Sequence, residues 1–167
     1  LFVLSPWSIS PLQAAVAPAV PNEDCLDCHV EPQTHKVQGK EVPLPVFQTN
    51  AFQKSIHAKL ACVDCHSGIK EAVHDSNPPP AQCVQCHESH PAHENAAKQY
   101  ASSIHGVSRT IGDSAAATCA DCHGKHDIAR VKDPESPVFK LNLPRTCAKC
   151  HSNAGLTEEY RIKYPHV

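Results

Sequence analysis

The sequence contains no methionine and few aromatic residues, and both shortages limit what the chain can build. Phe, Trp and Tyr together make up 5% of its 167 residues, against 15 prolines. A chain so poor in large apolar side chains cannot fill an ordinary hydrophobic core, and small domains of this kind commonly need covalent or metal staples. The absence of methionine also excludes a thioether sulfur as a metal ligand.

Neither sign of charge dominates the sequence. Its 15 Lys and Arg residues nearly balance 17 Asp and Glu residues, which leaves a formal net charge of −2. The chain has no basic patch and no Lys/Arg stripe with interleaved aromatic residues. The sequence therefore gives no support for nucleic-acid binding.

The sequence also lacks an uninterrupted apolar run. Residues 1–20 are apolar, but Pro6 and Pro11 break them, and a membrane-spanning helix needs about 20 continuous apolar residues. We therefore expect no transmembrane span. Residues 1–20 have two interpretations: a signal-peptide remnant with an A-x-A-like cleavage site, or an apolar N-terminal arm that packs on another subunit. Both place the protein outside the cytoplasm, exported to the periplasm or the extracellular space.

All ten cysteines lie in five copies of one motif, in which two cysteines separated by two residues are followed directly by histidine. We number the motifs one to five along the chain; they span residues 25–29, 62–66, 83–87, 119–123 and 147–151. Their cysteines are Cys25, Cys28, Cys62, Cys65, Cys83, Cys86, Cys119, Cys122, Cys147 and Cys150, and their histidines are His29, His66, His87, His123 and His151.

This motif is the attachment signature of c-type haem, in which the thiols bond to the porphyrin and the adjacent histidine is the proximal iron ligand. Two other interpretations explain less. Five cysteine pairs divide badly into zinc sites of four thiolates each, and such sites leave the histidines unexplained. A two-residue spacing also suits redox or metal chemistry better than a disulfide framework. The sequence therefore predicts five covalently attached haem c groups, each with one iron.

We expect the haems to supply the core that the side chains lack. Residues 21–167 then form a single compact five-haem domain that is mainly irregular, with short α-helices, little or no β-structure and stacked haems at its centre. The apolar periodicity favours helices over residues 50–68 and 94–106, with a short helix at 158–163. The proline-rich segments 41–47, 76–82 and 132–146 should run extended.

Each iron needs a second axial ligand, called distal, on the other face of the porphyrin. Methionine cannot supply it, whereas eight further histidines are present for five positions. Imidazole is a suitable ligand for iron. We therefore predict bis-histidine ligation at all five haems, with low reduction potentials because a methionine ligand raises the potential.

A repeated segment points to two of these histidines. Residues 52–58, "FQKSIHA", and residues 100–106, "YASSIHG", share an aromatic residue, then Ser-Ile-His, then a small residue. On a helix, the aromatic residue and the isoleucine four positions later form an apolar edge that can lie against a porphyrin. The histidine beside this edge reaches the iron, and the small residue admits the ring plane. We call these segments the first and second repeat, and they indicate His57 and His105 as distal ligands.

The sequence resembles a widespread group of bacterial and archaeal multihaem c-type cytochromes of anaerobic respiration. The resemblance lies in the order of its segments, which are the two repeats, motif two, "CADCHGKHDI" at 119–128 and "DPESPVFKLNLPRTCAKCH" at 133–151. The resemblance covers the chain from about residue 25 to the C-terminus. It implies distal ligands at His57, His74, His105 and His126, and a fifth at His166 in a degenerate C-terminal pattern. His35, His90 and His93 remain as secondary candidates, and His35 is also available to a haem of a neighbouring subunit.

These observations favour an electron carrier, not an enzyme. Five closely spaced bis-histidine haems pass electrons between redox partner proteins or extracellular acceptors without a substrate pocket. An extension of this hypothesis is a homo-oligomer or filament, because heterologous contacts that do not close give open chains of subunits. Two alternatives stay open: a haem subunit of a membrane quinol-oxidising complex, and a nitrite- or hydroxylamine-converting enzyme with an open iron site.

Overall fold

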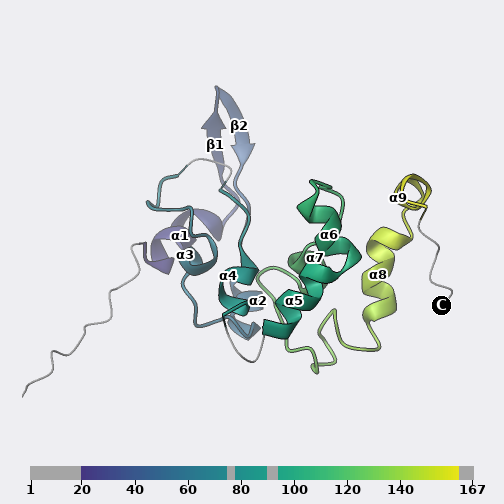
Figure 1. The fold of residues 1–167 in the computed structure, drawn as a ribbon. Helices are drawn as coiled ribbons and strands as arrows, with labels where there is room; N and C mark the ends of the chain where they lie inside the picture. Colours follow the sequence, from purple (N-terminus) through teal and green to yellow (C-terminus); the bar gives the residue numbers. More distant parts are fainter. Residues whose placement is uncertain (1–19, 75–77, 90–93, 162–167) are drawn as a thin grey trace, which may run out of the picture.

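The chain forms short helices joined by long irregular connections (Figure 1). The computed structural model describes residues 20–74, 78–89 and 94–161, so all but the last residue of segment 1–20 lie outside the described ranges. The helices are α1 (Asn22–His29), α2 (Thr49–Lys54), α3 (Cys62–Cys65), α4 (Cys83–His87), α5 (Glu94–Ser102), α6 (Ile104–Thr110), α7 (Cys119–His123), α8 (Leu143–His151) and α9 (Ala154–Glu159). The described strands are β1 (Thr34–Val37) and β2 (Lys40–Pro43). The predicted fold class, short α-helices and irregular backbone with little β-structure, is confirmed.

The elements follow one another across an elongated molecule (Figure 1). α1 and α3 lie together near one end, and α8 and α9 lie at the opposite end. Asn22 joins α1 to α3, because its side-chain oxygen accepts the backbone N–H of Cys62 at 2.8 Å. Every attachment motif lies in a short helix or ends directly after one. The chain therefore spreads its five motifs along the molecule.

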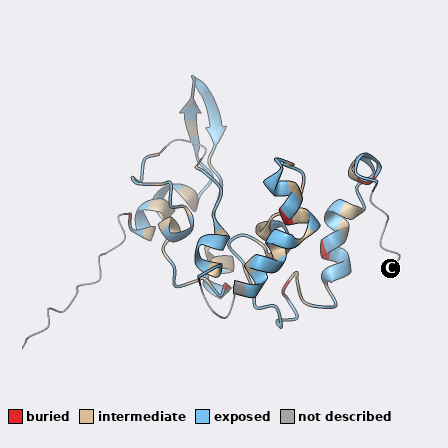
Figure 2. Cartoon of the chain, viewed as in Figure 1, coloured by how far each residue is buried: buried red, intermediate tan, exposed pale blue. Residues whose placement is uncertain are grey.

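The described part of the polypeptide has almost no hydrophobic core of its own (Figure 2). Among the described residues, Val20 is the only buried apolar side chain, while Ser55, Ser136, Thr146 and Thr157 are the buried polar ones. Large apolar side chains such as Ile104 and Ile111 are 75% and 80% exposed. So little apolar burial cannot offset the conformational entropy lost on folding. The fold therefore depends on groups other than its own side chains.

β1 and β2 form an antiparallel hairpin in which His35 pairs with Val42 and Lys36 with Glu41. The sequence analysis expected only extended backbone over 41–47. Gln38 and Gly39 have φ angles of 50° and 79°, and two successive positive values are typical of the tight turn that matches strand twist. Gln-Gly is a weaker turn signal than Asn-Gly, which is why the sequence pattern did not reveal the hairpin.

The connection before α8 is not extended, so the prediction for residues 132–146 is wrong. Its backbone forms successive turns in which N–H groups donate to carbonyls three residues earlier, from Ser136 to Asp133 at 2.9 Å and from Phe139 to Ser136 at 3.0 Å. The side chain of Asn142 donates to two further carbonyls of this segment at 2.8 and 2.9 Å. Asp, Ser and Asn favour such local turns, and here they outweigh the extended preference of the prolines.

The terminal helix lies earlier than predicted. The sequence analysis expected a helix over 158–163, whereas α9 begins at Ala154 and ends at Glu159. Asn153 starts it, because its side-chain oxygen accepts the N–H of Leu156 at 3.1 Å. Asparagine is a strong helix N-cap, and this signal decides where the helix begins.

Both repeats break at their serine, so the predicted continuous helices over 50–68 and 94–106 are wrong. Ser55 and Ser103 are extended, with φ, ψ of −65°, 150° and −75°, 162°. In each repeat the serine N–H donates to the carbonyl of the aromatic residue three positions earlier, Phe52 or Tyr100, at 2.9 Å. Serine competes for backbone groups and favours caps over helix interiors. The serine therefore ends one turn and begins the next, which carries the histidine.

The small residue of the second repeat, Gly106, is buried against the preceding turn. Its N–H donates to the Ser103 hydroxyl at 3.2 Å, and a Cβ at this position would collide with the backbone carbonyl of Tyr100. The sequence analysis assigned this small residue to a close haem approach, but the approach of the backbone already requires glycine.

We expect Gly106→Ala to destabilise the protein with its haems attached by about 1–3 kcal/mol, because the added methyl must displace the Tyr100 carbonyl. Thermal unfolding followed by circular dichroism measures the change. The matched control is Ala58→Gly at the same position of the first repeat, with an expected cost of at most about 1 kcal/mol. An unchanged melting temperature for Gly106→Ala would contradict the prediction.

Candidate haem sites

Four proximal histidines each face one of the predicted distal histidines. The ring centroids are 6.2 Å apart in His29–His74, 6.0 Å in His57–His87, 6.2 Å in His66–His126 and 6.2 Å in His105–His151. The interplanar angles run from 16° in the first of these pairs to 88° in the last. In every pair, a motif histidine meets a histidine from a segment far away in the sequence.

This separation fits one iron between two imidazoles. A metal–nitrogen bond to imidazole is about 2 Å long, so two collinear rings on one iron have centroids about 6 Å apart. The same distance recurs in four pairs although the ring planes meet at very different angles. One iron held between two imidazoles would fix this distance and leave the rotation of each ring free. The residues present therefore fit the group that the motifs predict.

Two proximal histidines differ in the surroundings of their Nδ1 atoms. Nδ1 of His29 lies 2.9 Å from the Pro45 carbonyl, and it must donate there because a carbonyl only accepts. Nε2 then remains for a metal. Nδ1 of His66 is buried and has no hydrogen-bond partner among the described residues. Burial also lowers the pKa of His66 and His123, which favours the neutral imidazole that metal binding requires.

None of the ten cysteines forms a disulfide bond, so the structure shows no disulfide framework. Thiols of neighbouring motifs contact one another. Cys119 donates a hydrogen bond to Cys83, which lowers the pKa of Cys83 to about 6 and raises that of Cys119. Burial and the contact with Cys25 raise the pKa of Cys62 to about 11. The attachment points of motifs one and two adjoin, and so do those of motifs three and four.

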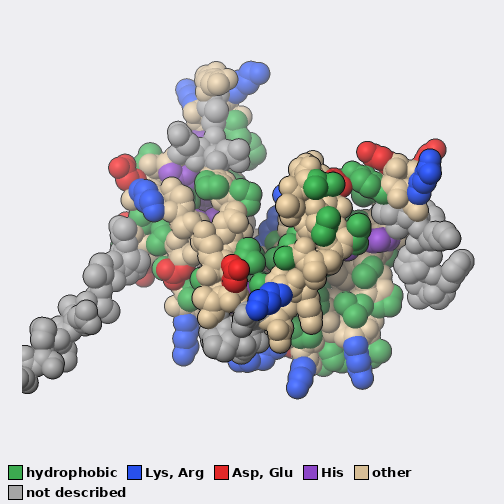
Figure 3. Space-filling model, viewed as in Figure 1, with side chains coloured by type: hydrophobic (Ala, Val, Ile, Leu, Met, Phe, Trp, Pro, Cys, Tyr) green, Lys and Arg blue, Asp and Glu red, His purple; other side chains and the backbone are tan. Residues whose placement is uncertain are grey.

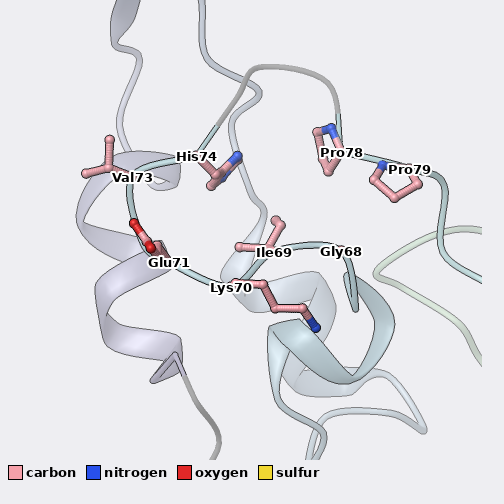
Figure 4. A pocket seen from close by; sticks show the side chains of 8 residues that line it. All are labelled: Gly68, Ile69, Lys70, Glu71, Val73, His74, Pro78 and Pro79. Atoms are coloured by element: carbon pink, nitrogen blue, oxygen red, sulfur yellow. The ribbon is translucent and has the colours of Figure 1, made fainter.

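The loop after motif two presents His74 beside an open hollow of about 360 Å³ (Figure 4). Pro78 and Pro79 lie across the hollow from this loop. A Cβ on Gly68 would lie 2.8 Å from the Pro79 ring, so glycine lets the two segments approach closely. The hollow thus borders the His29–His74 pair.

Aspartates inside two motifs cap the helices that carry them. A carboxylate oxygen of Asp121 accepts the N–H and the hydroxyl of Thr118, each at 2.6 Å. Asp64 accepts the N–H of Ala61 at 2.8 Å in the same way. The bonds from Thr118 lower the pKa of Asp121. Motif one holds Asp27 at the matching position, and its carboxylate has no such bond among the described residues.

We expect Asp121→Asn to cost about 0.5–1 kcal/mol of stability at neutral pH, and Asp27→Asn to cost less. The lowered pKa means that the cap stabilises the fold above the ordinary carboxyl pKa of 3.8 and that this contribution is lost as the pH falls below it. Denaturant unfolding at about pH 7 and about pH 3 measures both effects. An equal cost of Asp121→Asn at the two pH values would contradict the charge-dependent cap.

The other predicted histidines form none of these four pairs. Within the described residues, no second imidazole lies at the pair distance from His123 of motif four. The predicted ligand His166 and the secondary candidates His90 and His93 lie outside the described residues. His35 lies on β1, half-buried, and its role as a ligand stays a prediction.

The sequence analysis missed the contribution of the segment between β2 and α2. Phe47 packs edge-on against His126, with ring centroids 4.8 Å apart, and its N–H donates to the His29 carbonyl at 2.6 Å. Pro45 of the same segment orients the His29 ring. The sequence did hold one signal for this segment. Phenylalanine is rare in the chain, with only 4 residues, and one of them lies in this short proline-rich connector.

Other metal chemistry finds no support in the described ranges. No group of three or more His, Cys, Asp or Glu side chains there could hold a metal ion, which argues against the zinc interpretation. An iron porphyrin needs only two axial ligands from the protein, so histidine pairs suffice. None of the helices among the described residues has the length and apolar character that crossing a membrane requires.

Comparison with known proteins gives one match. A family model described as Cytochrome c3 matches residues 56–152, more than half of the chain. The matched range includes motifs two to five and three of the four histidine pairs. No curated protein and no solved structure matches the chain.

Proposed function

The chain belongs to the cytochrome c3 family, and from this premise we propose that it is a five-haem conduit for electrons. The family makes it a multihaem c-type cytochrome that carries electrons between redox partners on covalently attached haem c. The number five rests on the five motifs, which use every cysteine in the sequence.

Each histidine pair is assigned to one haem. His29 and His74 serve motif one, His66 and His126 motif two, His87 and His57 motif three, and His151 and His105 motif five. The recurring centroid separation of 6.0 to 6.2 Å is the observation that carries this assignment. For motif four, His123 is the proximal ligand, and we assign the remaining distal position to His166, the fifth distal ligand that the resemblance implies.

The chain's own residues hold and orient the haems. Haem iron supplies one-electron redox chemistry when bound. The paired cysteines would hold each porphyrin on a short helix, and the adjacent histidine and its distant partner would supply the two protein ligands of its iron. The Pro45 carbonyl fixes the rotation and the tautomer of His29. Filled axial positions leave no site for a substrate, which favours an electron carrier over an enzyme.

We further propose that the protein works outside the cytoplasm. The resemblance to cytochromes of anaerobic respiration supports a periplasmic or extracellular location. There the chain exchanges electrons with protein partners or extracellular acceptors. Assembly of copies of this chain into a filament is an extension of this proposal.

The haem count and the ligation are tested on the purified protein. Intact-mass measurement should give five haem additions per chain, and low-temperature EPR of the oxidised protein should show only low-spin haem. Carbon monoxide should leave the visible spectrum of the reduced protein unchanged. A high-spin haem that binds carbon monoxide would contradict bis-histidine ligation at all five sites and favour the enzyme alternative.

The unequal surroundings of Nδ1 predict unequal potentials at neighbouring haems. The hydrogen bond from His29 to the Pro45 carbonyl makes this imidazole a stronger donor, which stabilises ferric iron, whereas Nδ1 of His66 has no described partner. A hydrogen bond worth about 1 kcal/mol corresponds to roughly 40 mV for a one-electron couple. We expect the haem of motif one to have the lower potential of the two, as measured by NMR-monitored redox titration with haem-specific assignments. The opposite order would contradict this account.

A further inference from the structure

The motifs are ordered in space as they are in the sequence. Motif one adjoins motif two through the bond from Cys62 to Asn22, and Cys65 of motif two lies near Cys83 and Cys86 of motif three. Motifs three and four touch through their cysteines. Cys122 of motif four lies near Cys147 and Cys150 of motif five. Motif one in α1 and motif five in α8 therefore lie at the two ends of the series (Figure 1).

These two terminal helices carry opposite charges. Glu23, Asp24 and Asp27 of α1 are exposed, and residues 21–35 contain no Lys or Arg. Arg145 and Lys149 of α8 are exposed, and residues 137–157 contain no Asp or Glu. Figure 3 shows acidic side chains and a basic one at the α1 end, basic side chains along the whole lower edge including the part below α8, and acidic side chains at α9 beyond α8.

Helix stability accounts for only part of this distribution. A helix dipole favours acidic groups near the N-terminus and basic groups near the C-terminus. It favours Glu23 and Asp24 in the first turn of α1 and Lys149 in the last turn of α8, whereas Asp27 in the last turn of α1 and Arg145 in the first turn of α8 oppose the dipole of their own helix. Within the described residues, none of the five charged side chains of these helices forms an ion pair.

We propose that the acidic face of α1 on one molecule docks on the basic face of α8 on a second copy of this chain. One chain carries both complementary faces, at opposite ends, so the contact is heterologous and repeats into an open row. Exposed cysteines of the terminal motifs, Cys28, Cys147 and Cys150, lie on these same helices. The contact brings motif five of one molecule beside motif one of the next. This inference rests on the proposed function, because it extends the same haem series across molecules.

The test measures self-association of the protein with its haems attached by sedimentation velocity, followed at the haem absorbance. Charge attraction acts over about 30 Å at 0.01 M salt and only about 3 Å at 1 M. Wild-type protein should associate at low salt and separate at high salt. Reversal of the acidic end (Glu23→Lys, Asp24→Lys, Asp27→Lys) or of the basic end (Arg145→Glu, Lys149→Glu) should weaken association about tenfold or more.

A mixture of the two charge-reversed variants tests whether the acidic end binds the basic end. The two reversed variants should associate with each other when mixed, because each supplies the charge that the other has lost. The control Arg130→Glu, Lys132→Glu makes the same charge change before α8 and should associate like wild type. Neutral variants (Glu23→Gln, Asp24→Asn, Asp27→Asn) repeat the acidic-end test where reversal disturbs folding. Wild-type protein that stays monomeric at low salt, or reversed variants that associate normally, would overturn the proposal. Haem content and the low-spin spectrum of each sample report separately on the proposed function.

Discussion

A chain whose ten cysteines are all replaced by alanine should be largely unfolded. The described polypeptide buries one apolar side chain, Val20, and leaves Ile104 and Ile111 in solvent. A domain of this size is typically stable by about 5–15 kcal/mol, and here the cofactors must supply the burial behind that figure. Without covalent haem, we expect loss of helical circular dichroism and no cooperative melting transition.

The comparison protein is wild type with all haems attached, which should melt cooperatively. A second variant, with only Cys25→Ala and Cys28→Ala, removes the attachment at one end of the series. It should keep most of its helical signal, because the other four motifs remain intact. A cooperative transition in the variant without any cysteine would show that the polypeptide folds on its own, against the exposure pattern of its apolar side chains.

Replacement of His57 by alanine should convert one haem from low-spin to high-spin and open it to carbon monoxide. The His57 ring lies 6.0 Å from His87, so the affected haem is that of motif three. His57→Met should instead keep the haem six-coordinate and raise its potential by on the order of 0.1 V or more, because methionine is the ligand associated with higher potential. EPR, carbon monoxide difference spectra and potentiometric titration measure the three effects.

The matched control is His35→Ala, on β1, which forms none of the four pairs. It should leave spin state, carbon monoxide binding and potentials unchanged in the isolated protein. If His57→Ala remains entirely low-spin, another group fills the position and the assignment of His57 is wrong. If His35→Ala produces the high-spin haem, His35 is the distal ligand that the sequence analysis kept as a secondary candidate.

The haem-attachment motifs and the candidate distal histidines could be predicted from the sequence. The pairing of each distal histidine with a particular motif could not. A thiol pair followed by histidine indicates haem attachment wherever it occurs, and the repeats indicated His57 and His105. Which motif each distal histidine faces is a tertiary property. His126 lies three residues after motif four, yet its ring faces His66 of motif two. No periodicity or spacing encodes that choice.

The errors in secondary structure share one cause. Apolar spacing suggested continuous helices through both repeats, while the hydroxyls of Ser55 and Ser103 compete for backbone N–H groups and interrupt them. Likewise, the prolines of segment 132–146 suggested extended backbone, whereas the side chain of Asn142 stabilises a series of turns. Short polar side chains decided the local structure in each case, because no apolar core overrides them.

The crossed pairing of histidines also sets an order for the protein's biogenesis. Synthesis begins at the N-terminus, so motif two is made long before His126, which our assignment gives to its haem. On this assignment, a haem attached at motif two would lack its second histidine until the segment after motif four is made, whereas motif one would need the chain only as far as His74. A chain that ends before residue 126 would therefore lack the second ligand of motif two. Bis-histidine ligation at motif two would thus depend on the second half of the protein.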